Sequence, residues 1–240
     1  KLFFCTVLLG AGAGAFSAQH DLSDTPLFTL AGVDPNIVLT MDDSGSMAWS
    51  FMPTSVGDYP STKRAKSAAF NKIYYDPNVL YEPPVNEDGV SLGNASFTAA
   101  WDNGFNKSGS GSCTKNLSTS YRPSWGGINQ THCGSSNNSD GFYNRYATSS
   151  SEAAYYYLFD DSLSGCNGNV SDDDCYTKVV VTDTSGVGDT VDERVNFANW
   201  YSYYRKRVYV TKTAATLAFE RFNSNIRVGY QRINNSTLTG

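Results

Sequence analysis

Histidine is scarce in this sequence, and acidic residues outnumber basic ones. The 240-residue chain has two histidines, 18 Lys and Arg, and 23 Asp and Glu, which gives a formal net charge of -5. Nucleic-acid binding depends largely on Lys and Arg contacts to phosphates. The shortage of positive charge therefore argues against a nucleic-acid partner, and the acidic excess favours metal cations instead.

Long apolar runs are missing as well. The longest, "LFFCTVLLGAGAGAFSA", is shorter than the roughly 20 apolar residues of a membrane-spanning helix and is rich in glycine. An apolar run that passes into small residues is typical of a secretory signal peptide, whereas a membrane anchor or buried helix is the alternative. We predict that residues 1–18 are an incomplete signal peptide, cleaved near Ala18, with no membrane span after cleavage.

Cysteine is sparse, and its distribution favours disulfides over a metal centre. Cleavage near Ala18 would remove Cys5 and leave four cysteines: Cys113, Cys133, Cys166 and Cys175. An even number in an exported chain predicts disulfides, and four cysteines allow three pairings. The simplest joins Cys113 with Cys133 and Cys166 with Cys175. A zinc site is the alternative, but CxxC-type spacing is absent.

Regular structure is predicted mainly toward the two ends of the chain. Residues 37–41 form a short apolar run, which is typical of a strand buried on both faces. From about 51 to 188 the sequence is rich in Ser, Gly, Asn, Asp and Tyr, which predicts a long, irregular insertion. Within it, residues 153–159 and 176–182 predict a hairpin pinned by a disulfide.

A helix and a second strand are expected after the insertion. Thr190 and Glu193 have the spacing of a capping box, and apolar residues then recur at helical steps as far as Phe222. We expect one long helix over about 191–222 and a strand over about 226–231. Strand, loop, helix and strand in this order predict an α/β fold, a partial doubly wound sheet with parallel strands.

The loop after the first strand carries the candidate chemistry. Ligands of doubly wound sheets bind at the carboxyl ends of strands, where "DDSGS" is expected to lie. The spacing lets the Asp42 carboxylate and the hydroxyls of Ser44 and Ser46 converge on one point. These oxygen ligands suit Mg²⁺ or Mn²⁺, with Ca²⁺ as an alternative, and the low ligand charge lets the ion accept a carboxylate from a partner.

Several sequence blocks resemble known families. "NIVLTMDDSGSM" resembles the first strand and metal-ion-dependent adhesion site of a von Willebrand factor A domain. This block also belongs to a wider resemblance, to the amino-terminal part of the type IV pilus tip adhesin and biogenesis family (the PilY/PilC group). The other blocks are "SDTPLF", "NKIYYDPNVLYEPP", "CYTKV", "NFANWYSYYRKR" and "IRVGYQRIN". They are scattered over most of the chain, and "NFANWYSYYRKR" is the most specific.

The resemblance implies an exported, non-enzymatic protein that crosses the periplasm and reaches the pilus tip at the cell surface. There it would act in pilus assembly and metal-dependent attachment. The implied partners are minor pilins or a tip complex, and a host or surface ligand that contributes a carboxylate. The family pattern continues into the rest of the A domain and a β-propeller, so the remaining metal ligands are expected beyond Gly240.

Two other functions stay open. An exported A-domain surface adhesin with no pilus role would share the first strand and its loop. A secreted serine hydrolase would use "GVSLG", from Gly89 to Gly93, as its nucleophile elbow, with His20 or His132 as the base. That motif follows an acidic polar loop, whereas a nucleophile elbow lies between a strand and a helix.

Overall fold

The computed structural model describes residues 35–58, 61–107, 114–121, 123, 152–185, 192–222 and 226–233. The chain divides into two units, Lys1–Pro35 and Asn36–Gly240, and the elements below belong to the second. The expected signal peptide lies outside the described residues, as do Cys113 and Cys133. None of the helices in the described part of the chain has the length and apolar character of a membrane span.

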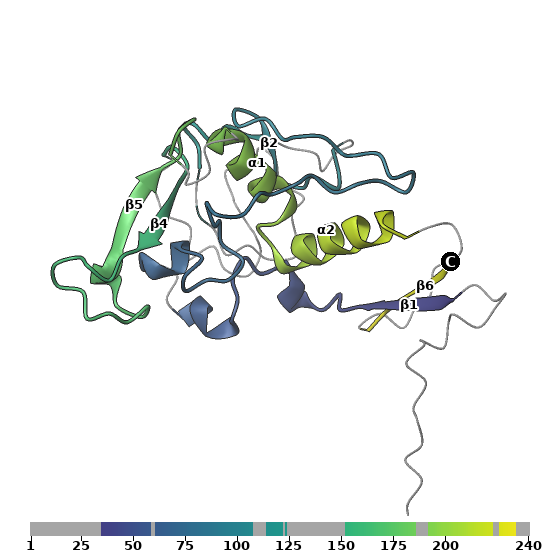
Figure 1. Ribbon diagram of the computed structural model, residues 1–240, viewed down its shortest axis with the longest axis horizontal. Helices are drawn as coiled ribbons and strands as arrows, with labels where there is room; N and C mark the ends of the chain where they lie inside the picture. Colours follow the sequence, from purple (N-terminus) through teal and green to yellow (C-terminus); the bar gives the residue numbers. More distant parts are fainter. Residues whose placement is uncertain are drawn as a thin grey trace, which may run out of the picture. The chain divides into compact units, whose positions relative to one another are not determined.

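The first and last strands form a parallel pair, as the sequence predicted. Strand β1 (Asn36–Met41) lies beside β6 (Arg227–Arg232), with Ile37 opposite Val228. A parallel pair needs a crossover connection, which here includes helix α2 (Arg207–Glu220) immediately before β6 (Figure 1). The mixture of helices and strands is compatible with the expected α/β class.

The insertion leaves and re-enters the fold at neighbouring points. The backbone N–H of Arg207, at the start of α2, donates to the carbonyl of Trp49 at 3.1 Å. The Arg207 Nε donates to the carbonyl of Phe51 at 2.8 Å. The intervening chain, about residues 52–206, is therefore inserted between the loop after β1 and α2, and it extends past the expected boundary at 188.

The single long helix expected over 191–222 is instead two helices. Helix α1 (Glu193–Tyr203) ends before α2 begins, and Lys206 between them has an extended backbone with φ -124° and ψ 151°. The Thr213 hydroxyl of α2 donates to the Tyr203 carbonyl at 2.8 Å, which satisfies an end group of α1. Because the apolar spacing continues through the break, the sequence pattern alone indicated one helix.

A long-range ion pair holds the break between the helices. The Arg205 side chain reaches Asp102 in the insertion, with Nη2 and Oδ1 3.2 Å apart. The Tyr201 hydroxyl donates to the same carboxylate oxygen at 2.5 Å. The partner of Arg205 lies about a hundred residues away in sequence, so local spacing could not reveal it.

Helix α1 starts two residues later than expected. Its N-cap is Asp192, whose side chain accepts a hydrogen bond from the Arg194 N–H at 2.9 Å. The expected cap, Thr190, lies outside the described residues, and Glu193 is the first helical residue rather than the third. Aspartate satisfies a free amide at a helix start as well as threonine does, which explains the shift.

The core of the insertion is unusually rich in tyrosine. Buried aromatic side chains from α1, from residues 74–81 and from the β4–β5 hairpin pack together, and the Tyr74 and Tyr121 hydroxyls are hydrogen-bonded at 2.7 Å. Two short strands, β2 (Ala100–Trp101) and β3 (Thr114–Lys115), pair nearby in antiparallel fashion. Short 3-10 turns, η3 (Thr54–Asp58) and η4 (Arg64–Lys66), precede this core.

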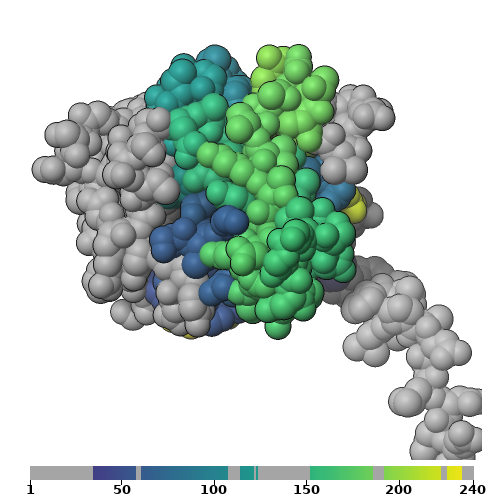
Figure 2. Space-filling model, turned by 90° about the vertical axis from the view of Figure 1, so that its left-hand side faces the viewer, coloured from purple at the N-terminus to yellow at the C-terminus, as the bar shows by residue number. Residues whose placement is uncertain are grey.

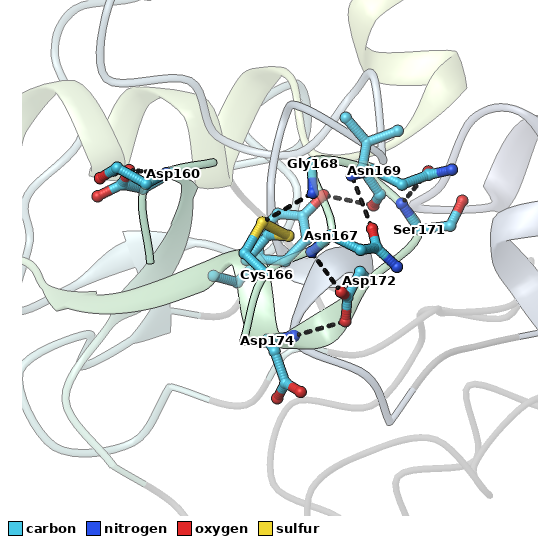
Figure 3. Close-up of a disulfide and its surroundings, with 12 residues drawn as sticks. Asp160, Cys166, Asn167, Gly168, Asn169, Ser171, Asp172 and Asp174 are labelled. Atoms are coloured by element: carbon cyan, nitrogen blue, oxygen red, sulfur yellow. Dashed lines mark hydrogen bonds between the residues drawn. A yellow bond between two sulfur atoms is a disulfide. The ribbon is translucent and has the colours of Figure 1, made fainter. Parts of the chain in front are cut away.

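The predicted disulfide-pinned hairpin is present. Strand β4 (Tyr155–Phe159) pairs antiparallel with β5 (Tyr176–Val180). Cys166 and Cys175 form a disulfide in the connection between them (Figure 3). Strand β4 contacts η4, and the backbone N–H of Arg64 donates to Asp173 at 3.1 Å. In Figure 2 green atoms accordingly lie beside blue atoms from the earlier part of the insertion.

Candidate functional site

The "DDSGS" sequence lies where the strand order predicted, directly after the carboxyl end of β1. Asp42 and Asp43 follow Met41, and Ser44 directly precedes a short 3-10 helix, η2 (Gly45–Ala48). This turn packs against α2. The three expected ligands, on Asp42, Ser44 and Ser46, therefore share one tight turn at the edge of the β1–β6 pair.

The geometry of this turn brings the expected ligands together. The Ser44 N–H donates to Asp42 Oδ1 at 2.8 Å, and the Oγ atoms of Ser44 and Ser46 lie 3.1 Å apart. Adjacent ligands of an octahedral Mg²⁺ ion, each about 2.1 Å from the metal, are about 3 Å apart. The two hydroxyls thus have a separation at which both could bind one ion.

Charge at the turn is concentrated on Asp42. Hydrogen bonds from the backbone and then the side chain of Ser44 lower the pKa of the Asp42 carboxyl below its usual range. The neighbouring Asp43 points to a different partner, because its Oδ2 lies 3.5 Å from an Nη1 atom of Arg232 at the end of β6. Asp42 is therefore the ionised ligand that the turn offers.

The oxygen atoms of Asp42, Ser44 and Ser46 suit a hard metal cation, but three protein ligands are few. One carboxylate and two hydroxyls are oxygen ligands of the kind that Mg²⁺ and Mn²⁺ prefer. Across the described ranges, no group of three or more His, Cys, Asp or Glu side chains is arranged to hold a metal ion. A bound ion would keep several waters unless other parts of the protein supplied more ligands.

The serine motif does not have the context of a nucleophile elbow. Ser91 is exposed and pairs with Val85 in an isolated β-bridge, and its Oγ accepts a hydrogen bond from the Gly93 N–H at 3.2 Å. A nucleophile elbow requires a strand-to-helix turn, whereas Gly89 and Gly93 here lie in a surface turn with positive φ. His20 and His132 lie outside the described residues.

Sequence reasoning missed a polar row along α1. The row consists of Asn196, Asn199 and Ser202, which recur every three residues and are all buried. Each accepts a hydrogen bond from a backbone N–H of the insertion, at 2.8, 2.8 and 3.0 Å respectively. Polar residues at a three-residue spacing within the aromatic block "NFANWYSYYRKR" were the available signal for this row.

Comparison with known proteins points to one group. The chain is 37% identical over 240 residues to the type IV pilus biogenesis factor PilY1 of Pseudomonas aeruginosa PAO1, and this match covers 96% of the chain. It is 35% and 34% identical to the PilY1 proteins of strains PAK and UCBPP-PA14. No family model matches the chain, and no solved structure matches it.

The match covers nearly all of this chain but only a small part of each relative. The 240 residues span 18 to 19% of the length of the three PilY1 proteins. The chain is thus similar over almost its full length to a single region of type IV pilus biogenesis factors.

Proposed function

We propose that this chain is part of a type IV pilus tip protein that acts in pilus assembly and in metal-dependent attachment. The similarity to PilY1 over 96% of the chain carries the pilus assignment. The chain spans only 18% of the length of that relative. The activity of the whole protein is therefore part of the proposal. The protein would be exported through the periplasm and displayed at the pilus tip on the cell surface.

The β1 strand, its "DDSGS" turn and the parallel β6 strand support a von Willebrand factor A-like domain. In this proposal Asp42, Ser44 and Ser46 hold Mg²⁺ or Mn²⁺, with Ca²⁺ as an alternative. The bound ion would supply a Lewis acid for a carboxylate on a host or surface ligand. The remaining ligands of the ion would come from outside this set of three residues. The chain itself supplies the charge on Asp42 and holds the two hydroxyls at 3.1 Å.

Minor pilins or a tip complex are the proposed partners in assembly. The second candidate function is that of an exported A-domain adhesin without a pilus role, because the turn geometry is independent of pili.

Deletion of the gene in a piliated host separates the pilus function from the second candidate function. We expect loss of surface pili in the deletion strain and recovery with the full-length gene, as measured by electron microscopy and shearing. Normal piliation in the deletion strain would favour the second candidate.

Metal binding by the 240-residue chain can be tested with Mn²⁺, which broadens the NMR signals of nearby amides. We expect broadening at Ser44 and Ser46 with millimolar affinity, equivalent to about 4 kcal/mol, because three protein ligands are few for Mg²⁺-like ions. Asp42→Ala should abolish the broadening, whereas Asp88→Ala, a substitution in an exposed turn, should leave the broadening unchanged. Equal broadening in wild type and Asp42→Ala would rule out the metal site.

A further inference from the structure

The segment that follows the "DDSGS" turn contacts the start of α2 through Arg207. The backbone N–H and Nε of Arg207 donate to the carbonyls of Trp49 and Phe51, at 3.1 and 2.8 Å. Its guanidinium carbon also lies 5.0 and 5.5 Å from the centroids of the Trp49 and Phe51 rings. The two rings are stacked, with centroids 5.1 Å apart and an interplanar angle of 15°.

Trp49 connects this contact to the candidate ligands. Its own N–H donates to the Ser46 carbonyl at 3.2 Å, while its carbonyl accepts from Arg207. The Met47 N–H donates to the Ser44 carbonyl at 3.0 Å in the same turn. A path of backbone hydrogen bonds therefore runs from the Arg207 N–H through Trp49 to Ser46, the last of the three expected ligands. The Arg207 side chain supports this path from beside it, through the Phe51 carbonyl and the rings of Trp49 and Phe51.

We propose that Arg207 is a positioning residue for the metal site, a role that rests on the proposed function of the "DDSGS" turn. Arg207 does not contact the ligands. It fixes the carboxyl end of η2 against α2 at the point where the insertion begins and ends. The Ser46 hydroxyl is thereby held beside that of Ser44, and the binding geometry exists before the ion arrives.

The chemistry of arginine suits this role. Its planar guanidinium can stack on an aromatic ring and direct a hydrogen bond in the same plane, whereas lysine supplies only a point charge. Arg207→Lys should therefore retain the charge but lose most of the positioning. Arg207→Gln should lose the cation–ring contact as well. Arg221→Gln, at the exposed far end of α2, is the matched control.

The first measurement needs no metal. Hydrogen–deuterium exchange of the whole 240-residue chain should show faster exchange at the Met47 and Trp49 amides in Arg207→Gln. Loss of the Nε–Phe51 hydrogen bond should make the turn open more often, by roughly tenfold. Arg207→Lys should show a smaller increase, and Arg221→Gln should show none. Unchanged exchange in both Arg207 variants would overturn the proposal, whatever the metal does.

The second measurement is the Mn²⁺ titration. Arg207→Gln should weaken Mn²⁺ binding about tenfold, as loss of a group that orients a metal ligand typically does. Asn199→Ala, which destabilises the insertion away from the turn, should leave Mn²⁺ affinity unchanged and so separates positioning from general stability. If Asp42→Ala abolishes binding but both Arg207 variants bind like wild type, only the positioning role fails. If wild type binds no better than Asp42→Ala, the metal function fails and the role of Arg207 fails with it.

Discussion

At the scale of single residues, Asn199 illustrates how α1 organises an insertion with little regular structure. The side chain is 3% exposed and makes three hydrogen bonds: it accepts from the Ala95 N–H at 2.8 Å, and it donates to the Tyr81 carbonyl and to Asn94 at 3.0 and 2.9 Å. Irregular chain segments lack the ladder bonds of a sheet, so buried backbone groups need such side-chain partners. The row on α1 supplies them.

Removal of this side chain should be costly. Asn199→Ala leaves at least two buried backbone groups without their partner, so we expect the free energy of unfolding to fall by about 2 to 4 kcal/mol. Urea unfolding followed by circular dichroism measures the change. Asn78→Ala removes an exposed side chain that donates to Asp76 at 3.0 Å, and it should change stability by less than about 0.5 kcal/mol. Equal effects of the two substitutions would contradict the role of Asn199.

Glu193 is a buried carboxyl at the start of α1 and should make stability depend on pH. It is 3% exposed, and burial raises its pKa even though the Tyr75 and Tyr156 hydroxyls donate to it. A raised folded-state pKa means that the stabilisation is fully present below the unfolded-state pKa, about 4.3, and is lost as pH rises through the folded-state value.

Glu193→Gln keeps an oxygen acceptor for Tyr75 and has no charge to bury. Relative to wild type, the variant should therefore become more stable as pH rises from about 4 to about 7. Thermal unfolding at both pH values gives the comparison. A stability difference that is independent of pH would show that Glu193 does not titrate in this range.

At the scale of elements, the β4–β5 hairpin combines a buried end, where Tyr155 and Tyr156 pack in the core, with an exposed connection that carries a disulfide. The connection between the strands is held by Asp172, which accepts from the Asn167 and Asp174 N–H groups at 3.0 and 3.1 Å (Figure 3). These carboxylate bonds shape the turn, but they are exposed to solvent. The Cys166–Cys175 bond closes the connection covalently.

Replacement of both Cys166 and Cys175 by alanine should lower the free energy of unfolding by about 2 to 3 kcal/mol. The estimate follows from the loop entropy released when a ring of about ten residues is opened. Urea unfolding under non-oxidising conditions measures it, and peptide mapping without reductant should confirm the bond in wild type. A free thiol at either position in the exported protein would contradict the account.

The elements differ in how far their sequences determine them. The β1–β6 pair and the hairpin were predictable because their apolar spacing and the turn residues around them are local. The break between α1 and α2 was not, because it depends on Arg205 meeting Asp102, which local spacing cannot reveal. The place of the "DDSGS" turn was predicted from the strand before it together with the residue spacing, whereas the contacts of Asp43 with Arg232 and of Trp49 with Arg207 join distant segments.

At the scale of the whole molecule, the β1–β6 pair is poorly covered. Val38, Tyr230 and Ile233 are 64, 56 and 68% exposed, although strands of a doubly wound sheet are normally buried on both faces. We expect the 240-residue chain to bind a hydrophobic dye such as anilinonaphthalene sulfonate. Val38→Thr combined with Ile233→Thr should reduce the fluorescence without unfolding the chain. Dye fluorescence that is the same in the variant would place the apolar surface elsewhere.

In the proposed function, Asp42, Ser44 and Ser46 bind a metal ion that a pilus protein uses for attachment. The most direct measurement compares attachment of cells that express the full-length protein as wild type, Asp42→Ala or the control Asp88→Ala, with Mg²⁺ and with a chelator. We expect cells with Asp42→Ala to attach at the level of chelated wild type, while cells with Asp88→Ala attach normally in Mg²⁺. Attachment of Asp42→Ala that equals wild type and still depends on Mg²⁺ would contradict the proposed function.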